Sequence, residues 1–225
     1  MARWQHPGIL FSLLMTATCV PSGAALAAEP MQCTVILDEE SGDTLYRKGA
    51  CDAALAPQST FKLPLAIMGY DAGILIDETQ PRWEYQAKFK RPKREQQATD
   101  PTIWERDSIV WYSQEITRRL GEKKFADYVK RFGYGNGNVK GVPGQTDGLT
   151  ESWLMSSLKI SADEQAEFVR SFLNGRLPFS EQAYDKTLAI IPKFAAADGW
   201  LYAEEVQLQG KKKMTAAEFL RGFRP

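Results

Sequence analysis

The chain of 225 residues has a single histidine, His6, although histidine is the side chain most often used for acid–base chemistry near neutral pH. We expect His6 to be removed with an export signal. Its loss excludes Ser-His-Asp triads, Cys-His pairs and histidine metal sites from the mature chain. The 28 basic and 28 acidic side chains balance, so no basic stripe is available to neutralise phosphates and we expect no nucleic-acid partner. Any proton transfer must use another side chain as its base.

Long apolar runs are absent beyond the N-terminal segment. Arg3 precedes a mostly apolar run at residues 9–20, and an alanine-rich stretch at 24–28 provides an A-x-A-like end, which is the pattern of a secretory signal peptide. The alternative is a membrane anchor, but the run is too short to span a bilayer and is interrupted by proline and glycine. We therefore expect a signal peptide over 1–27 and a periplasmic or secreted domain over 28–225, with no membrane span.

Cysteine is also scarce, with three in the chain, of which Cys19 leaves with the signal. Cys33 and Cys51 each lie nine residues from Gly42, in a stretch that reads as strand, turn and strand. A hairpin closing at Gly42 brings both strand ends together, so a disulfide is expected in an oxidising compartment. The alternative is two reduced, buried thiols.

The rest of the chain reads mainly as helices, with no internal repeat. Asp107 is predicted to cap one helix, and Ser161 with Glu164 forms a capping box ahead of another. The patterns predict helices at residues 57–70, 108–120, 122–132 and 165–173, and a long polar connection at 79–102. Together with the hairpin and a late strand-like segment, they predict an α+β fold.

Ser59 and Lys62 form an S-x-x-K pair at the start of the first predicted helix, so both side chains emerge on one face. A serine hydroxyl becomes a good nucleophile only when a base takes its proton, and with no histidine the nearby lysine is the candidate. Phe61 and Leu63 make the surroundings apolar, which disfavours the ammonium form of Lys62. The alternative from spacing alone is a helix N-terminal serine beside a solvated lysine.

Three further motifs follow in order, namely S-I-V at 108–110, Y-G-N at 134–136 and W-L-M-S-S-L at 153–158. With S-T-F-K at 59–62 they resemble the class D β-lactamases over most of the chain, from Cys33 to about Trp200. The resemblance implies one two-lobed domain of the serine β-lactamase and penicillin-binding transpeptidase type. In that fold an antiparallel sheet is flanked by helices, and a second lobe is all-helical.

The resemblance also implies roles for the motif residues. Ser59 would be acylated by the β-lactam carbonyl, and Lys62 would be carboxylated by carbon dioxide to act as general base, with no metal and no other cofactor. Trp153 would donate its indole N–H to the carbamate, and Ser108 would relay protons near the leaving nitrogen. Read without the family, Ser108 is a helix N-terminal serine and Trp153 a core residue.

The substrate-binding positions implied by the same resemblance are Val110, Tyr134 and Asn136. Without the family, Val110 reads as a core residue, while Tyr134 and Asn136 read as turn residues. The binding partner expected at these positions is a small β-lactam molecule.

The family's K-[ST]-G signature is not found near its expected place. In the run Q-G-K-K-K-M at 209–214, Lys211 matches the signature lysine, whereas Lys212 and Lys213 replace the hydroxyl residue and the glycine. From about Leu201 to the end, 201–225, nothing resembles the family, so its terminal strands are expected to be missing. A frame shift or gene rearrangement near Trp200 would produce such a change.

The resemblance implies hydrolysis of penicillin-like β-lactams. Two alternatives stay open. The chain could be a penicillin-binding or sensor-like protein that is acylated without turnover, or a truncated product without activity because its sheet has an unpaired edge.

Overall fold

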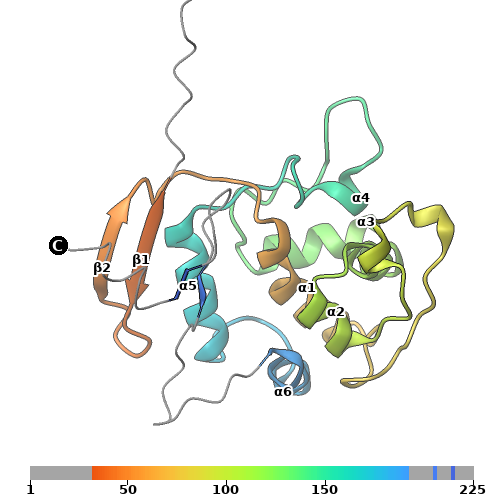
Figure 1. Ribbon diagram of the computed structural model, residues 1–225. Coiled ribbons are helices and arrows are strands. Elements are labelled where there is room, and N and C mark those ends of the chain that lie inside the picture. Colours follow the sequence, from red (N-terminus) through yellow and green to blue (C-terminus); the bar gives the residue numbers. More distant parts are fainter. Residues whose placement is uncertain (1–31, 193–204, 207–213, 216–225) are drawn as a thin grey trace, which may run out of the picture. The chain divides into compact units, whose positions relative to one another are not determined.

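The computed structural model describes residues 32–192 and the backbone of two short strands, 205–206 and 214–215 (Figure 1). All of these belong to the unit formed by residues 32–225. The predicted signal peptide over 1–27 and the assignment of Lys211 lie outside the described residues.

The N-terminal hairpin has the predicted form. Strand β1 (Cys33–Leu37) pairs antiparallel with β2 (Thr44–Gly49), with Cys33 opposite Gly49. A disulfide joins Cys33 to Cys51, whose Cα atoms are 5.0 Å apart, so the predicted bond is confirmed. Gly42 has a φ of 81°, a left-handed conformation that the turn requires and glycine adopts without strain.

The helices surround the rest of the core. In chain order they are η1 (Gln58–Phe61), α1 (Lys62–Asp71), η2 (Ala87–Phe89), η3 (Lys93–Glu95), α2 (Pro101–Asp107), α3 (Val110–Arg131), α4 (Gly148–Glu151), α5 (Ala162–Leu173) and α6 (Glu181–Ile190). Helix α1 packs against α3 and α6, and α5 packs against β1. The apolar run on α1 explains its place, because Leu65, Ile67 and Met68 are fully buried.

Helix α5 begins at the predicted capping box. The Ser161 hydroxyl accepts a hydrogen bond from the Glu164 backbone N–H at 3.2 Å, and the Glu164 carboxylate accepts one from the Ser161 backbone N–H at 2.8 Å. An ion pair of 2.8 Å between Arg47 on β2 and Asp163 ties the helix to the hairpin. The helix is therefore fixed to the hairpin by polar contacts as well as by packing.

The prediction that Asp107 caps a helix starting at Ser108 is wrong. Asp107 is the last residue of α2, and its carboxylate pairs with Arg106 at 2.7 Å. The N-cap of α2 is Asp100, whose side chain accepts a hydrogen bond from the Ile103 N–H at 2.9 Å, and Pro101 follows at the first helical position. Ser108 then takes a left-handed conformation that separates α2 from α3.

Two other helical features complete the architecture. Gly121 has non-helical torsions inside α3, so the predicted break between 108–120 and 122–132 is confirmed. Helix α6 was not expected from the sequence; it begins at Ser180, whose hydroxyl accepts from the Ala183 N–H at 3.3 Å. It packs mainly against α1 and also contacts α2.

The late strand-like segment contains two short antiparallel strands, β3 (Glu205–Val206) and β4 (Met214–Thr215). Helices together with small antiparallel sheets confirm the α+β class. Over the described residues, no helix combines the length and apolar composition needed to cross a bilayer.

Candidate active site

The structure brings together two serines from distant motifs. The Ser108 hydroxyl donates a hydrogen bond of 2.8 Å to the Ser59 hydroxyl, although the two residues are 49 positions apart. Ser59 lies in η1, directly before α1, and Ser108 lies between α2 and α3. Two hydroxyls in direct contact can pass a proton, which is what an activated serine needs.

Both serines depend on backbone that non-glycine residues rarely adopt. Ser108 has a φ of 55°, and Gln58, immediately before Ser59, has a φ of 50°. Such conformations cost free energy and persist only where the surroundings hold them. The Gln58 N–H donates to the Trp153 carbonyl at 2.8 Å, which anchors the turn that presents Ser59.

Lys62 is paired with a residue that the motifs did not indicate. Its ammonium donates a hydrogen bond to the backbone carbonyl of Glu105, and Nζ lies 3.5 Å from the carboxylate Oε2 of the same residue. The two side chains are only 14% and 13% exposed, so water screens the pair poorly. Burial raises the pKa of the Glu105 carboxyl above its usual range, and the charge of Lys62 opposes that rise.

Sequence reasoning treated the surroundings of Lys62 as apolar and missed Glu105. The local signal is the acidic and basic run E-R-D at 105–107, immediately before S-I-V. That signal is weak, since charged residues before a turn are usually solvated.

Trp153 lies in the aromatic core beside the site. Its ring stacks on Phe61 with centroids 5.5 Å apart and meets Phe125 edge-on at 6.1 Å. Because Phe61 lies between Ser59 and Lys62 in the sequence, Trp153 supports the turn that carries both. The structure thus gives Trp153 a packing role next to the predicted catalytic residues.

The predicted substrate-binding residues have structural contacts in this chain. Tyr134 is buried, its ring meets Phe61 edge-on at 5.3 Å, and burial raises the pKa of its phenol. Asn136 donates to the Ser157 carbonyl at 2.9 Å and accepts from the Lys159 N–H at 3.1 Å, so it joins two loops. Tyr134 and Asn136 therefore reinforce the loops around the aromatic core.

Val110 is half-buried at the start of α3. Its backbone N–H donates to the buried carboxylate of Glu95 at 3.0 Å. This bond fixes the start of α3, two residues after Ser108.

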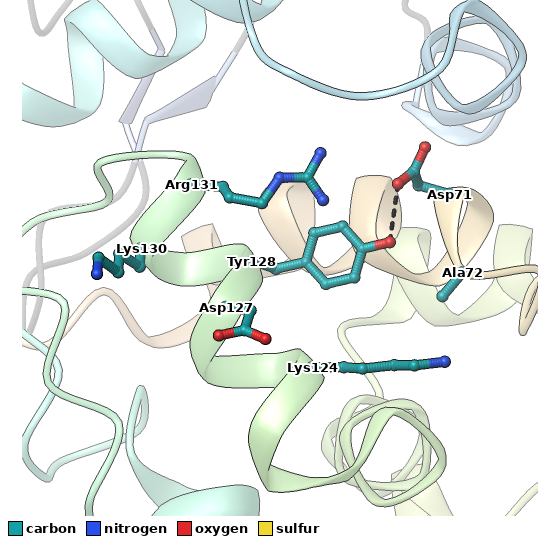
Figure 2. Close-up of a pocket in the computed structure, with 7 residues that line it drawn as sticks. All are labelled: Asp71, Ala72, Lys124, Asp127, Tyr128, Lys130 and Arg131. Carbon is teal, nitrogen blue, oxygen red and sulfur yellow. Dashed lines mark hydrogen bonds between the residues drawn. The ribbon is translucent and has the colours of Figure 1, made fainter.

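A cavity of about 790 Å³ lies away from these residues (Figure 2). In the close-up, the Tyr128 ring points toward Asp71, and its hydroxyl donates a hydrogen bond of 2.8 Å to that carboxylate. Lys124 and Arg131 also line the cavity, and none of the predicted site residues does. Within the described part of the chain, no group of three or more His, Cys, Asp or Glu could hold a metal ion.

Comparisons with known proteins identify the family of the chain. A family model, the penicillin binding protein transpeptidase domain, matches residues 26–211. Beta-lactamase OXA-9 of Klebsiella pneumoniae is 45% identical over 196 residues, which cover 85% of this chain and 72% of that protein. Beta-lactamase OXA-1 of Escherichia coli is 35% identical over 186 residues, covering 80% and 66%.

The solved structure of the class D β-lactamase OXA-427 aligns with a TM-score of 0.69 and 42% identity, covering 73% of this chain and 68% of that one. The resemblance carried by the ordered motifs and the fold expected from it are both confirmed. The chain belongs to the class D β-lactamases, within the penicillin-binding transpeptidase family.

Proposed function

We propose that this chain hydrolyses penicillin-like β-lactams through an acyl-enzyme on Ser59. The observation that carries the proposal is the 2.8 Å contact between the Ser59 and Ser108 hydroxyls, with Lys62 following Ser59 at S-x-x-K spacing. The related proteins bear the name β-lactamase, which supports the same reaction class. The signal-like segment over 1–27 supports a periplasmic or secreted location.

Each site residue has a distinct part in the proposed reaction. Ser59 Oγ attacks the β-lactam carbonyl carbon while the side chain of Lys62 takes its proton, and Ser108 passes a proton to the leaving nitrogen. Carbon dioxide added to the Lys62 amine would supply a carbamate, a better proton acceptor than an ammonium. The setting fits such a group because Lys62 is largely buried and the Trp153 indole lies beside Phe61.

Substrate recognition is proposed for Val110, Tyr134, Asn136 and Lys211. A lysine at position 211 could pair with the β-lactam carboxylate. No metal takes part in this proposal.

Acylation tests the assignment of Ser59. Incubation of the chain with a penicillin should add the mass of the drug to the peptide that carries Ser59, and Ser59→Ala should abolish the addition. Ser41→Ala, in the hairpin turn, is the matched control and should label like the unchanged chain. Labelling that survives Ser59→Ala would contradict the proposal.

A second candidate function is acylation without turnover. The match of residues 26–211 to the penicillin binding protein transpeptidase domain supports it. Product counting separates the two functions. A hydrolase releases many molecules of opened drug per chain, whereas a penicillin-binding protein stops at about one.

A further inference from the structure

Glu105 is the closest negative charge to Lys62 among the described residues. Its Oε2 atom is 3.5 Å from Lys62 Nζ and makes no hydrogen bond within residues 32–192. Its backbone carbonyl accepts a hydrogen bond from the same ammonium. Side chain and main chain of Glu105 therefore both contact the Lys62 ammonium.

Other titratable groups face this pair less directly. Asp107 also interacts with the charge of Lys62, but its carboxylate is engaged by Arg106 at 2.7 Å. Tyr70 on α1 interacts with the charge of Glu105, and its hydroxyl donates to the Asp77 carbonyl at 3.1 Å. Neither group is hydrogen-bonded or ion-paired to Lys62, which leaves Glu105 as the ionisable residue in direct contact with it.

We propose that Glu105 controls the carboxylation of Lys62, so that carbon dioxide adds to the lysine only when Glu105 takes up a proton. The inference rests on the proposed function, in which carboxylated Lys62 is the general base. Glu105 is a positioning residue in this account, acting through Lys62 and not on the substrate.

The reaction balances in charge and atoms. The ammonium of Lys62 loses two protons, and its nitrogen forms a bond to the carbon of carbon dioxide, giving a carbamate with one negative charge. One proton passes to the Glu105 carboxylate and the other leaves to solvent. Without the first transfer, two anions would lie side by side in a poorly solvated site, which strongly disfavours the product.

Burial supports the direction of that transfer. A carboxyl that is 13% exposed loses most of its hydration, which raises the pKa of Glu105 and makes protonation accessible. Protonated Glu105 then presents an O–H donor where the carbamate presents oxygen acceptors. The same residue thus changes from an ion-pair partner of the ammonium to a hydrogen-bond partner of the carbamate.

Carbamate formation can be measured without any substrate. The full chain is titrated with ¹³C-bicarbonate at constant pH, and the carbamate carbon of Lys62 is observed by NMR. Glu105→Gln removes the negative charge and should lower the half-saturating bicarbonate concentration by about 10- to 1,000-fold, the range that an opposite charge within 4–6 Å produces. Glu105→Asp keeps the charge and should stay near the unchanged chain.

Glu115→Gln is the matched control, because that carboxylate on α3 pairs with Arg118 at 3.5 Å and with Arg119, away from Lys62. Its half-saturating concentration should not change. If Glu105→Gln does not fold, the unchanged chain still tests the proposal by infrared spectroscopy. Its difference spectra with and without carbon dioxide should show a protonated carboxylic acid forming together with the carbamate.

The outcomes separate the two proposals. A carbamate that forms at equal bicarbonate concentrations in the unchanged chain and in Glu105→Gln, or without a protonated acid, overturns the role of Glu105 and leaves the proposed function standing. A carbamate absent from both chains at saturating bicarbonate overturns both.

Discussion

At the scale of single residues, the site depends on a serine in an unusual backbone conformation. Ser108 has a φ of 55°, and in this conformation its backbone N–H donates to the Trp104 carbonyl while its hydroxyl donates to Ser59. A left-handed serine costs on the order of 1–3 kcal/mol relative to a relaxed one. The conformation that lets the Ser108 hydroxyl reach Ser59 therefore lowers the stability of the folded chain at this position.

Two substitutions at Ser108 separate its chemistry from its strain. Ser108→Ala and Ser108→Gly both remove the hydroxyl, so each should lower the acylation rate by about 10²- to 10⁴-fold, as expected for loss of a proton relay. The free energy of unfolding should be about 1 kcal/mol higher for Ser108→Gly than for Ser108→Ala, because glycine tolerates positive φ. Stopped-flow acylation and urea unfolding measure the two effects. Full activity in Ser108→Gly would exclude the relay.

At the scale of elements, the boundary between α2 and α3 shows where sequence reasoning succeeds and fails. The capping box of α5 and the break at Gly121 were predictable because their signals are local. The boundary at Ser108 was not, because Asp107 ends α2 and pairs with Arg106 instead of capping the next helix, and its local sequence does not reveal this. The ion pair of Lys62 with Glu105 joins residues 43 positions apart, which no spacing rule anticipates.

Glu95 is predicted to stabilise the start of α3. Its fully buried carboxylate pairs with Arg91 at 3.0 Å and accepts the Val110 N–H at 3.0 Å. Glu95→Ala leaves the Arg91 charge and a backbone donor without that partner, so the free energy of unfolding should fall by about 3–5 kcal/mol. Glu84→Ala, on the exposed surface, should change it by less than about 0.5 kcal/mol. Comparable urea midpoints for the two variants would contradict this role.

At the scale of the whole molecule, polar contacts from both ends of α5 join the hairpin to the helical core, including hydrogen bonds from Arg170 to the Glu39 and Glu40 carbonyls. The disulfide closes the hairpin, Arg47 pairs with Asp163 on α5, and the Leu55 and Ile160 backbones form an isolated bridge. The hairpin and its disulfide could be predicted because they are close in sequence. Their attachment to α5 depends on contacts across more than 100 residues, which sequence patterns do not reveal.

The disulfide should stabilise the folded chain mainly by restricting the unfolded one. Cys33 and Cys51 are separated by 18 residues, and closing a loop of that size contributes about 3 kcal/mol on the chain-entropy estimate. A Cys33→Ser, Cys51→Ser double variant should lose that amount in urea unfolding, and the oxidised chain should fall to the same midpoint after reduction. Because the hairpin packs on α5 and not on α1, acylation of Ser59 in the folded fraction should persist. If the reduced and oxidised chains have the same midpoint, the hairpin is held by packing and by polar contacts such as those of Arg47 and Arg170. If Ser59 is no longer acylated in the folded double variant, the hairpin and the active site are coupled more strongly than their contacts indicate.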